Sequence, residues 1–201
     1  MSRRIKKMPS TPSVTPIYLF VEGKKTEPEY FGLFKQKFSI QDFRIFNEAG
    51  KSSNALLEKA KSRIKLGNLD PNALKYLVFD KDALTDEQFT DVFEKAKNEG
   101  FKIGFSNLNF EVWLLAHFEK LTKRPTSPSD KTVLEAKLTE NLNQAYKKGD
   151  RKQLEKIVSN YNQAIENASA VNEAVFDYQC TTVGTMLEGI LDKRKNKKGG
   201  D

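Results

Sequence analysis

Short apolar runs alternate with helical patterns along the first 120 residues of the chain, and this alternation restricts the fold more than any other feature. The candidate strands lie at residues 17–21 (IYLFV), 43–46 (FRIF), 76–79 (YLVF) and 102–105 (KIGF), and the first is a continuous apolar run. Segments of helical character follow them at residues 26–38, 53–66, 85–98 and 109–118. Continuous apolar runs of this length are typical of strands buried on both faces. The pattern therefore predicts an α/β fold, with a mostly parallel four-stranded sheet flanked by helices.

The character of the chain changes after residue 120. A loop rich in Pro, Ser and Thr is followed by apolar residues at helical spacing on both sides of a Lys-Lys-Gly-Asp turn at residues 147–150, which indicates a helical hairpin. A last helix is expected to begin near Thr181. We divide the chain into a disordered basic leader (1–16), an α/β core (17–120), a C-terminal helical extension packing on the core (121–192) and a disordered basic tail (193–201).

Composition limits the classes of partner and of site. The 201 residues carry a formal net charge of +7, which favours a polyanionic partner such as nucleic acid, although much of the excess lies at the two ends and also fits tails that only confer solubility. The single cysteine, Cys180, excludes an internal disulfide framework and a cysteine zinc site. No segment is long and apolar enough to span a membrane, and the leader lacks the apolar centre of a signal peptide. We expect a cytoplasmic protein.

Carboxylates follow two of the predicted strands. Glu22 comes directly after residues 17–21, and Asp80 and Asp82 follow residues 76–79. In an open parallel sheet, ligands bind beyond the carboxyl ends of the strands, and carboxylate oxygens are preferred ligands of Mg²⁺ and Mn²⁺. Each acid alone is equally compatible with an ordinary loop residue. Together they predict a metal site able to support phosphoryl chemistry.

The residues after Glu22 fit a substrate-binding turn. Gly23 suits a place where the backbone turns or approaches a ligand closely. Lys24 and Lys25 lie near the start of the next helix, where anions are attracted and a phosphate is a natural ligand, although they also fit plain surface lysines. Thr26 and Glu29 have the spacing of a helix capping box.

A third group of polar residues follows the fourth predicted strand. Asn107 and Asn109 lie at the same ligand-binding edge, and either could cap the next helix. Glu111 falls in the first turn of that helix, where it fits a simple dipole interaction, a further metal ligand or a general base. His117 fits either a packed, hydrogen-bonded histidine or a group that orients a carboxylate or contacts a phosphate.

Four blocks of this sequence resemble the RloB-like (AbiLii-like) proteins. They are EGKKTEPEYF at residues 22–31, FDKD at residues 79–82, SNLNFEVWLLAHF at residues 106–118 and TTV at residues 181–183. The third block is similar to the family pattern S-N-P-x-F-E-x-W-x-L-x-H-F. Leu108 departs from this pattern, because the family usually has proline there. Cys180, directly before the fourth block, is a second departure, because proline is common at that position. Neither position is a proposed catalytic group.

The resemblance implies a Toprim (Rossmann-like) fold in which a strand-end glutamate and a D-x-D pair hold Mg²⁺ and act on phosphodiesters. Glu22, Asp80 and Asp82 match those positions. It also implies an effector nuclease in prokaryotic antiphage or abortive-infection defence, acting on DNA or RNA, including tRNA, often with an ABC-type ATPase encoded nearby. The helical extension would contact that ATPase, a second copy of the chain or the substrate. The alternatives are a catalytically weak binding or regulatory subunit and, with less support, a nucleotidyl transferase.

Overall fold

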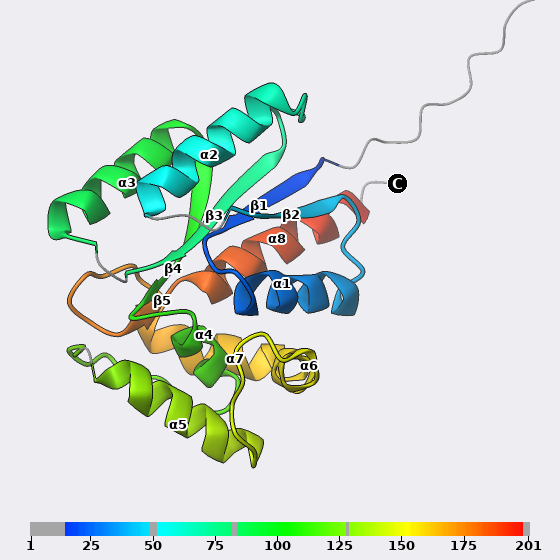
Figure 1. Ribbon diagram of the computed structural model, residues 1–201. Coiled ribbons are helices and arrows are strands. Elements are labelled where there is room, and N and C mark those ends of the chain that lie inside the picture. The colour runs from blue at the N-terminus through cyan, green and yellow to red at the C-terminus, as the bar shows by residue number, and fades with distance from the viewer. Residues whose placement is uncertain (1–14, 49–51, 82–83, 128, 199–201) are drawn as a thin grey trace, which may run out of the picture.

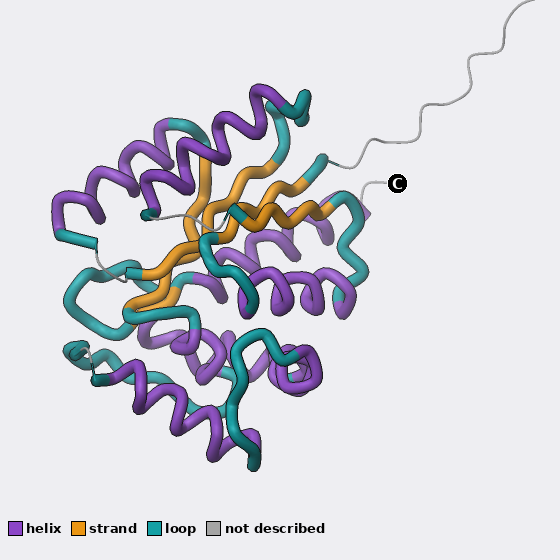
Figure 2. The backbone as a smooth tube through the Cα atoms, in the orientation of Figure 1, coloured by secondary structure: helices purple, strands orange, loops and turns teal. Residues whose placement is uncertain are grey.

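Five strands form one sheet, in the order β2-β1-β3-β4-β5 (Figures 1 and 2). This computed structural model describes residues 15–48, 52–81, 84–127 and 129–198. The strands are β1 (Ile17–Val21), β2 (Phe43–Asn47), β3 (Leu74–Asp80), β4 (Phe101–Asn107) and β5 (Cys180–Thr181). The first four are parallel and β5 is antiparallel to β4. The predicted α/β class and mostly parallel sheet are confirmed.

Helices cover both faces of the sheet. Figure 1 shows α2 and α3 on one face and α1 and α8 on the other, with the remaining helices gathered beyond the carboxyl ends of the strands. The helices are α1 (Thr26–Lys37), α2 (Ser53–Leu66), α3 (Asp86–Asn98), α4 (Glu111–Ala116), α5 (Asp130–Leu142), α6 (Arg151–Ser159), α7 (Tyr161–Ala168) and α8 (Val183–Lys198). No helix in these described ranges is long and apolar enough to cross a membrane.

The core begins with β1, which lies between β2 and β3 and is buried along its whole length. Leu19, Phe20 and Val21 are fully buried. A five-residue strand with no charged side chain is stabilised by burial at the centre of the sheet, and its one polar group, the Tyr18 hydroxyl, accepts a hydrogen bond from the Asp70 amide. Its position fixes where the chain emerges at Glu22.

The segment after residue 120 belongs to the sheet as well as to the helical layer. Cys180 and Thr181 pair with Asn107 and Ser106 to form β5, where we expected a helix to begin. Only two residues pair, so no alternating pattern long enough to predict a strand exists there. The two helices expected on either side of the turn are present as α5 and α6, but α5 packs mainly against α4 and α6 against α1, so they do not form the predicted hairpin. The second expected helix is also divided: α6 ends at Ser159 and α7 begins at Tyr161.

The two ends of the chain differ in what the structure describes. The predicted leader lies outside the described residues except for positions 15 and 16, where the carbonyl oxygen of Pro16 accepts a hydrogen bond from the Leu74 amide. At the other end, α8 continues to Lys198. The helix therefore includes residues 193–198 of the predicted basic tail. Residues 199–201 lie outside the described part.

Two glycines of α8 offer a matched test of the packing between this helix and the rest of the core. A Cβ on Gly184 would lie 2.9 Å from the Trp113 ring, whereas a Cβ on Gly189 would meet nothing within 4 Å. We expect Gly184→Ala to lower the free energy of unfolding by about 1–2 kcal/mol, because the buried indole cannot retreat. Gly189→Ala should raise it by roughly 0.5–1 kcal/mol through helix propensity. Urea unfolding of both variants measures the difference, and equal effects would contradict this packing.

Candidate functional site

The strand order places a topological switch point between the ends of β1 and β3. The chain goes from β1 to β2 on one side of β1, and then crosses by way of α2 to β3 on the other side. Open α/β sheets commonly bind ligands at such a switch point. Glu22 follows β1, and its amide donates to the Val78 carbonyl oxygen of β3 at 3.1 Å. Asp80 ends β3 opposite Ser106 of β4. Both acids therefore follow strands that border the switch point.

The predicted metal site is described only in part. Asp82 lies outside the described residues, so the structure does not place it relative to Glu22 and Asp80. Within the described ranges, no three His, Cys, Asp or Glu side chains converge closely enough to hold a metal ion. The trio therefore stays a prediction. What the structure adds is a second set of acids around Glu22.

Gly23 makes room for Glu27, a carboxylate that the sequence did not single out. A Cβ on Gly23 would lie 1.8 Å from Glu27 Oε2, so the Glu27 carboxylate rests directly against the glycine backbone. The close approach expected at Gly23 is thus made by a side chain of the same protein. α1 begins at Thr26, and its N-cap residue, Lys25, makes no side-chain hydrogen bond to the helix. Glu27, in the first turn, can therefore fold back onto the Gly23 backbone. The predicted capping box is wrong, since Thr26 is already inside the helix.

Three glutamates act on one another at this end of α1. The pKa of Glu27 is raised from 4.5 to about 7, mainly by burial and in addition by the negative charges of Glu111 and Glu22, while a backbone hydrogen bond and Lys148 oppose the shift. We call Glu22, Glu27 and Glu111 the carboxylate cluster. A raised pKa of this kind shows negative charge gathered where water cannot fully solvate it, which is common at functional sites.

Glu111 is the most enclosed member of the carboxylate cluster. It is 4% exposed and lies in the first turn of α4. The Tyr146 hydroxyl donates to its Oε1 at 3.1 Å, and Lys148 Nζ lies 3.3 Å from the same oxygen. Lys148 Nζ also lies 3.1 Å from Glu135 Oε1. Glu111 is therefore a paired, buried carboxylate, not a solvated helix-terminal acid.

Tyr146 and Lys148 come from the loop at residues 143–150, between α5 and α6, and this loop is fixed on both sides. The Gln153 side chain accepts from the Lys147 amide at 2.9 Å and donates to the Ala145 carbonyl oxygen at 2.8 Å. Gly149 has φ +75°, and a Cβ there would lie 2.7 Å from the Lys25 Cβ. The loop thus lies against the start of α1.

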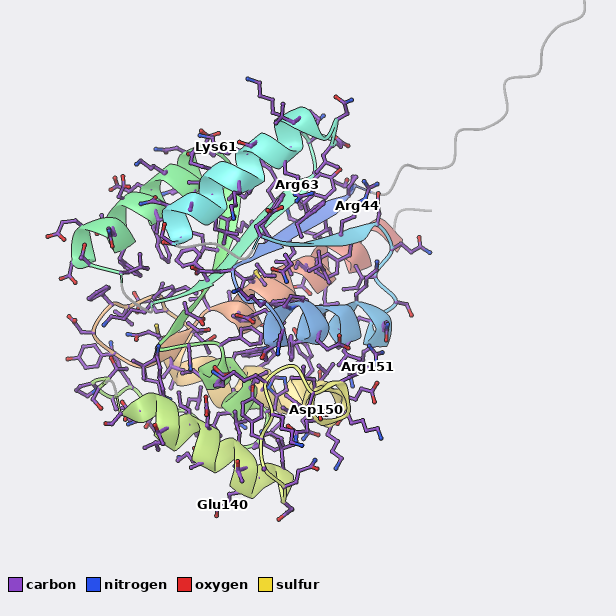
Figure 3. All side chains as sticks on the ribbon, viewed as in Figure 1. Arg44, Lys61, Arg63, Glu140, Asp150 and Arg151 are labelled. Atoms are coloured by element: carbon purple, nitrogen blue, oxygen red, sulfur yellow. The ribbon has the colours of Figure 1, made fainter. Side chains whose placement is uncertain are left out.

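The contact continues where α6 begins, at the labelled Asp150 and Arg151 of Figure 3. Asp150 caps α6 by accepting from the Gln153 amide at 3.0 Å. Arg151 forms an ion pair with Glu29 at 2.5 Å and donates to Gln36 at 3.1 Å. Two residues of α1 therefore hold the segment that delivers Lys148.

Lys24 and Lys25 have exposed side chains beside the carboxylate cluster. The Asn47 side chain donates to the Lys24 carbonyl oxygen at 3.0 Å, which ties this turn to the end of β2. The backbone is thus fixed while both ammonium groups face solvent. Their exposure fits both the phosphate-binding role and the plain surface role that the sequence leaves open.

Asn107 and Asn109 do not cap α4, whose N-cap is Phe110 with no side-chain bond. Asn107 is fully buried, and its Nδ2 donates to the carbonyl oxygens of Phe176 at 2.5 Å and Tyr178 at 2.8 Å. Its observed role is to fasten the loop before β5. Asn109 is 5% exposed, and its Oδ1 has no hydrogen-bond partner in the described structure. The Oδ1 atom of Asn107 also has no partner among the described residues, so each of the two asparagines keeps a buried amide oxygen able to accept a hydrogen bond.

His117 lies in the aromatic core. It is 1% exposed, and its Nδ1 lies 3.0 Å from the carbonyl oxygen of Trp113 and 3.2 Å from that of Leu114. Because a carbonyl only accepts, Nδ1 carries the proton and Nε2 accepts from the Tyr30 hydroxyl at 3.1 Å. Burial lowers the pKa of His117 from 6.5 to about 4, so the ring is neutral. The sequence allowed two roles for His117, and the structure shows the packed, hydrogen-bonded one.

Sequence reasoning missed Glu27, Tyr146 and Lys148 as residues of this site. Glu27 stands within the EGKKTEPEYF block, so its proximity to Glu22 was a usable signal. Tyr146 and Lys148 follow Glu111 by more than thirty residues, and no local pattern connects them.

The family model for RloB-like proteins matches residues 17–190, which covers most of the chain and all four sequence blocks. No curated protein and no solved structure matches the chain.

The raised pKa of Glu27 predicts a pH-dependent stability. The folded protein binds this proton more tightly than the unfolded chain, so the stabilisation is complete below pH 4.5 and is lost as the pH rises through 7. Relative to Glu27→Gln, the wild type should lose about 2 kcal/mol of unfolding free energy between pH 5 and 8, after allowance for solvent reaching the carboxylate. Urea unfolding in chelator measures this. The exposed Glu94→Gln serves as control, and parallel profiles for wild type and Glu27→Gln would contradict the assignment.

The single histidine of the chain makes its protonation directly measurable. We expect the imidazole resonances in an NMR titration to move with a pKa near 4. The unfolded chain takes up this proton near pH 6.5, so stability should fall as the pH drops from 6.5 towards 4, by up to about 3 kcal/mol. His117→Gln should remove this part of the acid dependence. A resonance titrating near 6.5 would place the ring in solvent and overturn the hydrogen-bond assignment.

Proposed function

The chain belongs to the RloB-like family, and we propose that it is a Mg²⁺- or Mn²⁺-dependent Toprim-type nuclease that hydrolyses phosphodiester bonds of DNA or RNA. One observation carries the proposal. Glu22 and Asp80 stand at the ends of two adjacent buried strands, at the switch point of the strand order. A strand-end glutamate and the first acid of a D-x-D sequence occupy these two places, as the family resemblance implies.

The donors at this edge suit a hard divalent cation. They are carboxylates, the one cysteine is buried and the one histidine is neutral in the core. The pKa of Glu27 is raised mainly by burial, and the negative charges of Glu111 and Glu22 add to the shift. Glu22, Asp80 and Asp82 would hold the ion, which when bound would supply positive charge against the reacting phosphodiester.

The surrounding residues have chemically distinct tasks in this proposal. Lys24 and Lys25, exposed at the start of α1, would bind substrate phosphates. Glu111 would serve as an additional ligand or as the general base, with its carboxylate oriented by the Tyr146 hydroxyl. Asn109 offers a buried amide oxygen without a partner at the same edge. Binding and orientation thus come from the chain itself.

The biological setting follows from the family. We propose an effector in prokaryotic antiphage or abortive-infection defence, acting in the cytoplasm together with an ABC-type ATPase encoded nearby. The substrate is nucleic acid, with tRNA among the candidates. The helical extension provides surface for the ATPase or for a second copy of the chain. None of these partners is needed to assemble the carboxylate cluster, because all of its members belong to one chain.

A catalytically weak nucleic-acid-binding or regulatory subunit is the second candidate. Two observations favour it. Lys148 already pairs with Glu111, and the described residues contain no ready group of three metal ligands. In this alternative the basic surface binds nucleic acid and the cluster is structural.

Cleavage of labelled single-stranded DNA, duplex DNA, RNA and tRNA tests the proposal. We expect metal-dependent cleavage that falls at least about 100-fold in Glu22→Ala and in Asp80→Ala, because each removes a carboxylate from the proposed metal site. The assay should be run with and without the neighbouring ATPase, since the nuclease is expected to be held silent until infection is sensed.

The exposed α3 variant Glu87→Ala, which should cleave like the wild type, serves as the matched control. Both site variants should first be shown to fold by circular dichroism. Equal activity in Glu22→Ala and wild type would assign the cleavage to another site or another protein. Tight binding without cleavage, with the ATPase present, would favour the regulatory subunit.

A further inference from the structure

We propose that Tyr178, with Lys123 beside its ring, is a stacking site for an unpaired base of single-stranded nucleic acid. The inference rests on the proposed nucleic-acid substrate. It deepens that proposal by naming single strands as the substrate class and by naming the side chain that selects them. The site lies on the loop before β5, away from the residues to which metal or phosphate binding is assigned above.

Tyr178 presents an aromatic ring to solvent. Among the exposed large apolar side chains of the described residues it is the one aromatic group, and it is 38% exposed. The other two, Leu66 and Val133, lie on α2 and α5. An aromatic ring that is open to solvent can stack on any unpaired base, because every base has a π-face. The ring of Tyr178 therefore has the chemistry and the exposure that a stacking site requires.

The loop that carries Tyr178 is held on two sides. From β4, Asn107 Nδ2 donates to the Tyr178 carbonyl oxygen at 2.8 Å. From the segment before α5, Pro125 forms an isolated bridge with Tyr178, and the Arg124 carbonyl oxygen accepts from the Gln179 amide at 2.8 Å. The backbone under the ring is thus fixed before any ligand arrives, so little conformational freedom is lost on binding.

Lys123 supplies positive charge beside the ring. Its side chain is exposed, and its Nζ lies 5.4 Å from the centre of the Tyr178 ring. This distance is near the outer limit of a cation–π contact, so the ammonium can turn to a phosphate while a base covers the ring. Arg124 pairs with Asp130 instead, and the exposed Asp177 carries the opposite charge. The ring, and not an excess of charge, is therefore the main source of affinity here.

The loop adjoins the strand end that carries Asp80. The Phe176 carbonyl oxygen accepts from the same Asn107 Nδ2 that holds Tyr178, at 2.5 Å. Lys81, which directly follows Asp80, places its Nζ 3.9 Å from the centre of the Phe176 ring. Figure 1 shows this loop, in orange, beside the carboxyl end of β4. A strand stacked on Tyr178 would thus lie next to the edge of the sheet where we place the reaction.

Binding in chelator tests the stacking site without any cleavage. The probes are a fluorescein-labelled oligothymidine and an oligonucleotide of equal length with abasic sites, which keeps the phosphates and lacks the bases. By fluorescence anisotropy, we expect the wild type to bind the oligothymidine about tenfold more tightly than the abasic probe. Tyr178→Leu, which keeps an apolar side chain without a ring, should lose this preference.

Two further variants and a duplex probe serve as controls for Tyr178→Leu. Tyr178→Phe should keep the preference for bases, because stacking needs the ring and not the hydroxyl. Leu66→Ala changes an exposed apolar side chain on α2 and should bind like the wild type. Tyr178→Leu should bind a duplex of the same length as the wild type does, because paired bases are stacked within the duplex and do not reach the ring.

Lys123→Gln separates the charge from the ring. Loss of one phosphate contact to a single strand should reduce the slope of log K against log salt concentration by about 0.7, with the preference for bases retained. Tyr178→Leu should show the opposite pattern, with an unchanged slope and no preference. A wild-type slope in Lys123→Gln would overturn the role given to Lys123.

These outcomes separate the stacking site from the proposed nuclease. If the wild type binds both probes equally, or if folded Tyr178→Leu keeps the preference, the stacking site is wrong while the nuclease proposal stands. If the preference depends on Tyr178 but the cleavage assay above fails, the nuclease is wrong and the stacking site stands. If neither probe binds at low salt, the nucleic-acid substrate is wrong and the stacking site falls with it.

Discussion

The parallel pairing of β1 with β3 is the constraint on which the site depends. Both strands are buried in the middle of the sheet, so the close packing of the core holds the positions of their ends. Glu22 follows β1 and Asp80 ends β3, on the two sides of the switch point in the strand order. A register shift of one residue in either strand would turn one of these acids to the opposite face. The apolar side chains of the two strands exclude such a shift.

Gathering acids at the end of a buried sheet creates an electrostatic cost, and the helical extension lowers it. Glu111 would be an uncompensated buried charge without Tyr146 and Lys148, both of which come from the loop between α5 and α6. The same part of the chain also completes the sheet with β5 and covers it with α8. The extension is therefore part of the site and of the core, and the acids of the first 120 residues depend on it.

The sequence was sufficient for the features that arise from local pattern. Apolar runs identified the four parallel strands, and the residues that follow them identified Glu22 and Asp80 as edge acids. It was insufficient where contacts join distant segments. Lys148 reaches Glu111 across more than thirty residues, and Asn107 binds carbonyl groups about seventy residues away. Periodicity carries no information on such contacts, because it reports which face a residue occupies and not what lies opposite it.

The contrast between His117 and the carboxylate cluster separates structural polar groups from functional ones. His117 is buried, but both of its nitrogens have partners and the surrounding aromatic side chains keep it neutral. Such a fully satisfied group specifies the core and has no capacity left for a ligand. The cluster is different, because the pKa of Glu27 is raised to about 7 and the Asn109 amide oxygen lacks a partner in the described structure. Glu27 and Asn109 both follow strand ends at the carboxyl edge of the sheet, so a ligand bound there could satisfy groups that the protein itself leaves under-compensated.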